Sequence, residues 1–487
     1  MSNLVIRKKN EVYLQVETEP HVHYELSEFF CFEVEQAKFM QRQQRYKRWD
    51  GKIRLYSPGT GEIYVGLIDY LIDWAYEHGH TVTYQESEWF GHPYDENELV
   101  TPEAVVGFVK SLRLPHRVRD YQYRGIYEAL RYNRRLLLSP TASGKSLMIY
   151  ALVRYHLNMD RNILIVVPTT SLVEQMYKDF EEYGWMASKY CHKIYAGAEK
   201  YTDHDVIITT WQSVYKEPRK WFDRFDVVIG DEAHLFKSKS LTTLMTKLHS
   251  CKHRVGFTGT LDGSNTNQLV LEGLFGKCTQ VTKTKDLMKA GHVAKLKVRV
   301  LVFEHPVQNF ASYQDEIDWI VENPRRNNFI RNLAKDLEGN TLILFNYVER
   351  HGEPLFELIN NSVDKPVHFV HGGVDVGDRE AIREITEKSN NSIIVASYGT
   401  FSTGINIRNL HNVIFASPSK SRVRNLQSIG RVLRKGENKS QAILYDLADD
   451  TSKGASRRNY TLNHLIERVK VYNEEKFDYE ILNVKIK

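Results

Sequence analysis

Cysteine is scarce in this chain of 487 residues, and long apolar runs are missing. The four cysteines lie far apart without a CxxC pair, which favours free thiols in a reducing compartment over disulfides or a zinc site. No apolar run approaches the roughly 18 residues of a membrane-spanning helix. The first twenty residues lack the apolar core of a signal peptide. We therefore expect a cytoplasmic protein without a membrane partner.

An excess of charge of one sign is also missing. The 66 lysines and arginines nearly balance the 61 acids, and the chain is 42% apolar and 26% charged, as is usual for globular proteins. The resulting net charge of +5 permits binding to nucleic acid without predicting it, because the distribution of charge matters more than its sum. At about 100–200 residues per domain, the length predicts three or four domains.

The stretch SPTASGKS at 139–146 has the pattern of a phosphate-binding loop. An apolar run at 135–138 and a helical spacing of apolar residues after 146 supply the strand and helix that this motif requires. Gly144 lets the backbone approach the phosphates, Lys145 is expected to reach the β- and γ-phosphates, and the Ser146 hydroxyl is expected to ligate Mg²⁺. The pattern usually begins with a glycine where this chain has Ser139, and an ordinary turn before a helix is the alternative. The candidate nucleotide ligands here are Thr141, Ser143, Gly144, Lys145 and Ser146.

A second motif, DEAH at 231–234, follows the apolar run at 227–229. A buried strand would deliver Asp231 to hold Mg²⁺, Glu232 to polarise the attacking water, and His234 to couple the nucleotide to the next element. A surface acidic turn is the alternative, and it fits the apolar run poorly. Upstream, Gln122 lies 23 residues before Lys145, where its amide could read the adenine edge; a surface glutamine is the alternative.

Other apolar runs in the first half also end in hydroxyl side chains. They lie at 163–167, 206–208 and 255–257, and all-apolar runs of this length are typical of strands in a parallel sheet covered on both faces. Ligands bind at the carboxyl edge of such sheets. The candidates that follow these runs are Thr169, Thr210, Trp211, Thr258 and Thr260.

The alternation of strand and helix restarts after a lysine-rich stretch at 283–296. Strands are expected at 341–346, 367–373, 392–397 and 413–416, without a second phosphate loop. Arg431 and Arg434, three residues apart, would share one helix face and could act as arginine fingers on a γ-phosphate. A basic solvated helix face is the alternative.

The N-terminal stretch 38–56 interleaves seven basic residues with aromatic ones and holds one acid, Asp50. Asp50-Gly51 predicts a hairpin turn between 46–49 and 52–56. Basic side chains neutralise phosphates and aromatic rings stack on bases, so a nucleic-acid surface is expected. A solvated hairpin is the alternative. The candidate contacts are Arg45, Lys47, Arg48, Trp49 and Lys52.

The motifs PTASGKS, DEAH, TGT and QSIGRVLR, in this order, resemble those of superfamily 2 helicases over about residues 115–450. The resemblance implies two RecA-like domains with ATP in the cleft and nucleic acid across both. It places Gln122, the phosphate loop and the two acids on one wall of the ATP site, and Arg431 and Arg434 on the other. It also implies residues that contact the nucleic-acid backbone, residues that couple the nucleotide state to other elements, and two further residues that contact the nucleotide. These are Thr169, Thr210, Ser397 and Thr403 for nucleic acid, His234, Thr258, Thr260 and Gln427 for coupling, and Gly404 and Asn406 for the nucleotide. The family often has Asp where this chain has Asn406.

Four further segments, RYKRWDGKIRLY, TTWQSVYK, VASYGTFSTGINIRNLH and EEKFDYEILNV, are similar to those of phage recombination helicases that migrate DNA branches. This likeness implies a 3′ to 5′ DNA motor that remodels forks, Holliday junctions and R-loops with ATP and Mg²⁺. It implies a monomer in the host cytoplasm, with other recombination proteins as further partners. An RNA helicase, a strand-annealing DNA-binding protein with weak motor activity and the motor of a restriction enzyme are the alternatives.

The sequence thus predicts an α/β protein with two tandem RecA-like parallel-sheet domains. A small N-terminal α+β nucleic-acid-binding domain would precede them, and a short C-terminal helical appendage would follow. The expected boundaries are 1–95, 110–294, 295–450 and 451–487.

Overall fold

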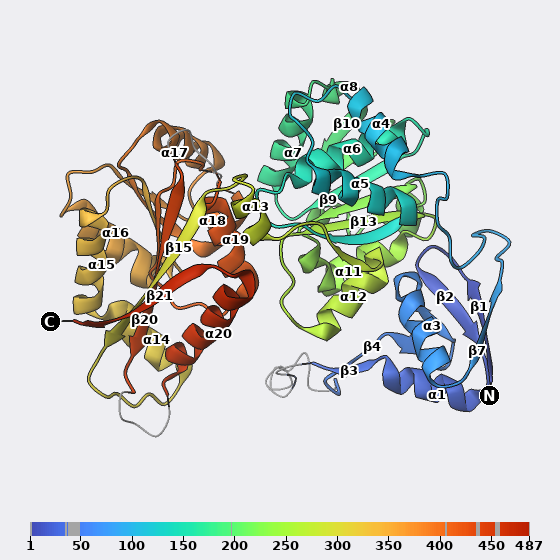
Figure 1. The fold of residues 1–487 in the computed structure, drawn as a ribbon, viewed down its shortest axis with the longest axis horizontal. Helices are drawn as coiled ribbons and strands as arrows, with labels where there is room; N and C mark the ends of the chain where they lie inside the picture. Colours follow the sequence, from blue (N-terminus) through green and yellow to red (C-terminus); the bar gives the residue numbers. More distant parts are fainter. Residues whose placement is uncertain are drawn as a thin grey trace. The chain divides into compact units, whose positions relative to one another are not determined.

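The structure is a computed structural model, and it describes residues 2–34, 37, 49–195, 197–404, 407–434, 439–452 and 458–486. The chain divides into two compact units (Figure 1). The first comprises residues 1–139 and 144–281, and the second comprises residues 140–143 and 282–487. Among the described helices, none is long and apolar enough to cross a membrane.

The N-terminal part of the first unit is the predicted small α+β fold. A five-stranded sheet has the order β5-β6-β2-β1-β7, in which β1 pairs parallel with β7 and the other pairs are antiparallel. Its strands are β1 (Asn3–Lys8), β2 (Tyr13–Glu17), β5 (Tyr56–Ser57), β6 (Glu62–Tyr64) and β7 (Thr81–Gln85). Its helices are α1 (Pro20–Phe29), η2 (Val65–Leu67) and α3 (Ile68–Glu77). Leu4, Ile6, Leu14 and Val16 alternate with less buried residues and form its core, as period-two patterning requires.

Asp50-Gly51 forms a turn before strand β4 (Lys52–Arg54), which pairs antiparallel with β3 (Cys31–Glu33). The predicted partner segment 46–49 lies, except for Trp49, outside the described residues. Gly51 has a φ of +82°, and the Asp50 carboxylate accepts from the Lys52 backbone N–H at 3.1 Å. The predicted turn is therefore present, and β3, which was not predicted to pair here, lies beside β4. Residues 38–48, with most of the predicted basic stretch, lie outside the described residues.

The rest of the first unit is a seven-stranded parallel sheet of order β10-β11-β9-β12-β13-β8-β14. Its strands are β8 (Arg134–Leu138), β9 (Ile163–Val167), β10 (Cys191–Ile194), β11 (Val206–Thr210), β12 (Val227–Asp231), β13 (His253–Thr258) and β14 (Cys278–Gln280). Its helices are α4 (Pro102–Ser111), α5 (Asp120–Tyr132), α6 (Lys145–Leu157), α7 (Thr170–Glu182), α8 (Ala187–Tyr190), α9 (Trp211–Val214), α10 (Arg219–Phe222), η3 (Ala233–Lys237), α11 (Lys239–Lys247) and α12 (Asn265–Phe275).

Both faces of this sheet are covered, which explains its nearly all-apolar strands. Successive residues of β9 point to opposite faces: Ile163 and Ile165 belong to the cluster with α5, α6 and α7, and Leu164 and Val166 to the cluster with α11 and α12. The cluster that contains Leu164 and Val166 continues into the core of the N-terminal fold. The two parts of the first unit therefore share one hydrophobic core.

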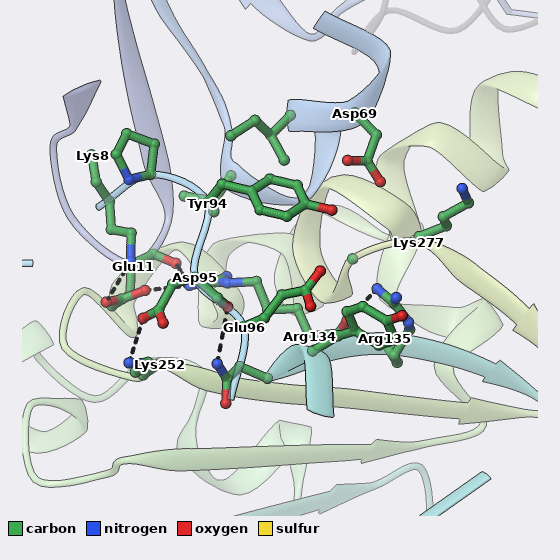
Figure 2. A pocket seen from close by; sticks show the side chains of 17 residues that line it. Lys8, Glu11, Asp69, Tyr94, Asp95, Glu96, Arg134, Arg135, Lys252 and Lys277 are labelled. Carbon is green, nitrogen blue, oxygen red and sulfur yellow. Dashed lines mark hydrogen bonds and ion pairs between the residues drawn. The ribbon is translucent and has the colours of Figure 1, made fainter. Parts of the chain in front are cut away.

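Charged side chains reinforce this junction, as Figure 2 shows. The Glu11 carboxylate pairs with Arg134 at the start of β8 and lies 3.5 Å from the Lys8 ammonium, whose pKa is lowered by burial. The Tyr70 hydroxyl donates to Glu272 at 2.6 Å. A pocket opens here between the two parts. It lies at the amino end of β8, whereas the phosphate loop follows the carboxyl end of that strand.

The second unit contains another seven-stranded parallel sheet, of order β17-β18-β16-β19-β20-β15-β21. Its strands are β15 (Lys295–Glu304), β16 (Thr341–Phe345), β17 (Val367–Val370), β18 (Ile393–Ser397), β19 (Asn412–Phe415), β20 (Gln441–Asp450) and β21 (Asp478–Lys485). Its helices are α13 (Thr284–Lys289), α14 (Tyr313–Glu322), α15 (Pro324–Asp336), η4 (Val348–Gly352), α16 (Glu353–Asn360), α17 (Val376–Lys388), α18 (Tyr398–Gly404), α19 (Arg422–Val432) and α20 (Tyr460–Glu475). The four predicted strands are confirmed as β16 to β19.

The predicted C-terminal appendage contains its expected helix, α20, but it also supplies a strand. Helix α20 ends before Lys476, which has a φ of +55°, and β21 then pairs parallel with β15 at the sheet edge. Arg468 of α20 is buried and pairs with Asp446 of β20 at 2.9 Å. The segment 458–486 is therefore part of the second sheet and its covering layer rather than a separate appendage.

Candidate active site

The phosphate-loop sequence follows a strand and precedes a helix, as its motif requires. The Ser139 backbone N–H donates to the Thr258 carbonyl at 2.8 Å, which fixes the loop's start to β13. Inside the loop, the Ser143 hydroxyl donates to the Pro140 carbonyl at 2.6 Å. Gly144 precedes the first residue of α6, so the backbone N–H groups at the start of this helix face the loop. Thr141 and Ser143 lie in the same loop.

The Gln122 side chain packs against the backbone at Gly144. Its side chain is buried, and its Oε1 accepts from the Arg119 backbone N–H at 2.9 Å. A Cβ at position 144 would lie 2.3 Å from its Nε2 atom, and Gly144 also has a φ of +82°. Both the positive φ and the close approach of the Gln122 amide therefore favour glycine at this position.

Strand β12 brings the two acids to the same edge of the sheet. Asp231 is its last residue, and one of its carboxylate oxygens accepts from the Glu232 backbone N–H at 2.9 Å. Glu232 has a left-handed φ of +49°. Its carboxylate lies 3.4 Å from the Lys145 ammonium, with both side chains largely buried. The phosphate loop and the DEAH motif, far apart in the sequence, thus meet through one ion pair.

His234 extends this cluster toward β13. Its Nδ1 lies 3.0 Å from the Thr258 hydroxyl and 3.5 Å from the Glu232 carboxylate. Burial lowers the pKa of His234, and the Glu232 charge opposes this shift. The Thr258 hydroxyl also lies 3.1 Å from the Thr260 carbonyl oxygen, to which it can donate. A continuous chain of polar contacts therefore runs from the phosphate loop to the end of β13.

Tyr183, which no sequence motif marks, contacts the candidate Mg²⁺ ligand Ser146. The two hydroxyl oxygens are 2.9 Å apart. Burial raises the pKa of Tyr183 to about 12, so its hydroxyl stays protonated at neutral pH. Ser146 and Asp231 offer a hydroxyl and a carboxylate, both of them the hard oxygen ligands that Mg²⁺ prefers alongside phosphates and water. The donor set fits this ion.

The nucleic-acid candidates of the first unit lie at the ends of β9 and β11. Thr169 caps α7, and its hydroxyl accepts from the Leu172 backbone N–H at 3.4 Å. Thr210 is buried with its hydroxyl 2.9 Å from that of Ser213. Trp211 packs against Tyr215. Their contacts to nucleic acid stay predictions.

The candidates of the second unit gather around α18 and α19. Ser397 ends β18, and its hydroxyl donates to that of Thr400 at 2.8 Å. Thr403 and Gly404 lie in the last turn of α18, and Asn406 lies outside the described residues. Gln427 and Arg431 lie on α19, whereas Arg434 follows the end of that helix at Val432. The expectation that both arginines share a helix face is therefore wrong for Arg434, because the helix ends before it.

The N-terminal candidates are described only in part. Arg45, Lys47 and Arg48 lie outside the described residues. The Trp49 indole N–H donates to the Lys52 carbonyl at 2.9 Å, beside the turn. Lys52 is exposed. A role of this surface in binding nucleic acid stays a prediction.

Family models match three parts of the chain. The model described as DNA helicase UvsW, N-terminal, matches residues 4–85. The model described as Type III restriction enzyme, res subunit, matches residues 115–263, and the Helicase conserved C-terminal domain matches residues 325–436. Between them they cover the N-terminal fold and most of both parallel-sheet regions.

Individual proteins extend this likeness over the whole chain. The chain is 34% identical to the ATP-dependent DNA helicase uvsW of Enterobacteria phage T4, over 97% of the chain and 98% of that relative. The crystal structure of T4 UvsW matches with a TM-score of 0.52 and 31% identity over 100% of both chains. The ATP-dependent Type ISP restriction-modification enzyme LlaBIII bound to DNA matches with a TM-score of 0.57 over 77% of this chain and 31% of its own. Its identity of 16% shows a likeness of fold alone.

Proposed function

The chain belongs to the UvsW family of superfamily 2 helicases, and from this membership we propose that it is an ATP-dependent DNA helicase that remodels branched DNA. The proposed reactions are fork regression, Holliday junction branch migration and R-loop unwinding. One observation carries the proposal beyond the likeness: the Lys145 ammonium and the Glu232 carboxylate lie 3.4 Å apart at the end of the phosphate loop. A nucleotide phosphate bound at this loop would meet both groups.

The residues of the first unit then take distinct roles toward ATP. The backbone N–H groups at the start of α6 and the Lys145 ammonium bind the phosphates. Gln122, held by Arg119, reads the adenine edge through its amide. Ser146 and Asp231 would hold Mg²⁺, which supplies charge neutralisation on the phosphate oxygens when bound. Glu232 orients and polarises the attacking water.

The second unit contributes groups that act on the negative charge that develops on the γ-phosphoryl group during hydrolysis. Arg431 and Arg434 are proposed to stabilise the γ-phosphoryl group during its transfer to water. Gly404 and Asn406 contact the nucleotide, and Gln427 couples it to nucleic acid. On the first unit, His234, Thr258 and Thr260 form the corresponding coupling path, which rests on the contacts between His234, Glu232 and Thr258.

DNA is proposed to contact strand ends of both units and the N-terminal surface. The backbone would lie along Thr169, Thr210 and Trp211 of the first unit and along Ser397 and Thr403 of the second. The N-terminal contacts would come from Arg45, Lys47, Arg48, Trp49 and Lys52. We propose that the protein acts as a monomer in the host cytoplasm, alongside other recombination proteins.

The domain organisation of the chain favours branched DNA over long duplexes as its substrate. Among the described residues, the second unit holds one sheet with its helices and no additional inserted sheet. In branch migration each broken base pair is replaced by a new one, so the net change in pairing energy is close to zero, as in R-loop exchange. A compact motor can therefore drive this reaction with little work per step.

Two rival functions give different results in one assay. An RNA helicase would hydrolyse ATP faster with RNA than with DNA, and an annealing protein with an inactive nucleotide site would show no hydrolysis above background. We expect hydrolysis that DNA stimulates more than RNA does and that Lys145→Ala abolishes. Equal or greater stimulation by RNA would contradict the assignment to DNA.

A further inference from the structure

Lys439 is a buried lysine at the end of α19. It is 4% exposed and precedes β20 in the second unit. Its ammonium donates to the backbone carbonyls of Val432, of Arg434 at 3.2 Å and of Arg408 at 3.4 Å. Three N–H donors thus meet three carbonyl acceptors.

The Val432 carbonyl belongs to the last residue of α19, and the Arg434 carbonyl lies two residues beyond it. The last carbonyls of a helix have no partner within the helix, and the negative end of the helix dipole favours a cation there. The Leu433 carbonyl between them accepts from the Ala294 backbone N–H at 2.8 Å. Lys439 and Ala294 therefore hold three successive carbonyls, in the stretch that carries Arg431 and Arg434.

The third carbonyl belongs to a different segment. Arg408 follows α18, whose last residue is Gly404, and its backbone N–H donates to Glu387 at 3.1 Å. Helices α18 and α19 pack against each other, as Figure 1 shows. One ammonium group thus connects the end of α19 to the segment after α18, and both bear residues assigned to the ATP site.

We propose that Lys439 is a positioning residue for ATP hydrolysis, which fixes the end of α19 so that Arg431 and Arg434 keep the geometry that turnover requires. This inference rests on the proposed role of the two arginines. Lys439 itself reaches backbone carbonyls rather than the nucleotide, so it acts through α19. Its loss should slow turnover and leave ATP binding, which the phosphate loop provides, nearly unchanged.

A matched control exists in the same unit. The Lys365 ammonium donates to the carbonyls of Leu337 at 2.5 Å and Ala334 at 3.3 Å, at the end of α15. This helix carries no proposed site residue. Lys439→Met and Lys365→Met therefore remove the same kind of contact from a helix with site residues and from one without. Lys439→Gln, which keeps two N–H donors, is the milder variant if Lys439→Met folds poorly.

The first measurement is steady-state ATP hydrolysis at saturating DNA, with thermal unfolding of each variant as the check on folding. Misplacement by about 1 Å costs up to roughly 100-fold in rate, so we expect kcat of Lys439→Met to fall roughly 10- to 100-fold, with KM for ATP changed by less than about threefold. Lys439→Gln should be intermediate, and Lys365→Met should match the unmodified protein. An unchanged kcat in folded Lys439→Met or Lys439→Gln overturns the inference.

A double variant tests whether Lys439 acts through the arginines. Arg434→Ala alone should lower kcat by about 10³-fold. If Lys439 only positions this arginine, Lys439→Met with Arg434→Ala should lie within about threefold of Arg434→Ala. Multiplied effects would show that Lys439 does not act through Arg434. If Arg434→Ala leaves kcat unchanged, the finger assignment of the proposed function fails and this inference with it; an impaired Arg434→Ala beside a normal Lys439→Met overturns this inference alone.

Discussion

The Lys145 ammonium lies 3.4 Å from the Glu232 carboxylate, and the two side chains are only 14% and 19% exposed. Each residue belongs to a different motif, and each has a predicted role toward the terminal phosphate of ATP. A phosphate that attracts Lys145 would compete with Glu232 for it. Binding of ATP would thereby free the carboxylate to orient water.

Lys145→Ala should abolish ATP hydrolysis and also lower stability, because it leaves the Glu232 carboxylate largely buried without its cation. Removing one partner of such a pair costs about 1–3 kcal/mol. Adding Glu232→Gln should recover part of this loss and leave hydrolysis at background. Urea unfolding of both variants and of Glu232→Gln measures the effect. A double variant no more stable than Lys145→Ala would mean that the pair contributes little.

Gly144→Ala should impair ATP binding because its Cβ would lie 2.3 Å from the Gln122 side chain. Gly184 is the matched control, since its φ of +83° is nearly the same and nothing lies within 4 Å of its Cβ position. Both substitutions carry a backbone penalty of about 1 kcal/mol. Titration with a fluorescent ATP analogue should show weaker binding in Gly144→Ala alone. Equal affinities in the two variants would show that Gln122 can move aside freely.

Neutralising Arg45, Lys47 and Arg48 together should weaken DNA binding and flatten its dependence on salt. Each duplex phosphate contact releases about 0.9 counterions. The log–log slope should therefore fall by about two to three units. Binding isotherms at several salt concentrations give the slope. An unchanged slope would mean that this surface does not contact DNA.

Turnover should depend on pH through Lys439. Burial lowers the pKa of this lysine to about 7. Its side chain is therefore a protonated ammonium with three N–H donors below this pH, and it loses one donor above it. Among the described residues, the charged and titratable groups on the neighbouring segments include Arg408, His411, Arg431, Arg434, Lys295 and Glu387. Titration of these neighbouring groups affects the unmodified protein and Lys439→Met alike, so the ratio of their kcat values cancels this effect. We expect this ratio to shrink as pH rises from 6 to about 8, and a ratio that grows would contradict the prediction.

The sequence predicted those features that depend on neighbouring residues. Buried strands at 163–167 and 227–231 follow from apolar runs, and the position of Lys145 follows from the strand and helix around its loop. Parallel strands then bring their carboxyl ends to one edge, so the meeting of Lys145 with Glu232 is a consequence of topology.

Contacts between distant residues without a motif were not predictable. Tyr183 reaches Ser146 because α7 packs against α6, and Lys439 reaches Arg408 because the segments after α18 and α19 lie close together. Strand β21 was missed because the whole segment 451–487 was predicted as a helical appendage. The pairing of β4 with β3 beside Gly51 was not predicted, because a turn signal does not specify every strand that pairs next to it.

The most direct test of the account compares two DNA substrates with matched arm lengths. One is a four-way junction, and the other is a linear duplex with a single-stranded tail, each with ATP and with Lys145→Ala as the control without motor activity. If the protein remodels branches, ATP should drive migration of the junction faster than unwinding of the duplex, and Lys145→Ala should do neither. Faster unwinding of the tailed duplex would contradict the account and indicate a motor that separates strands.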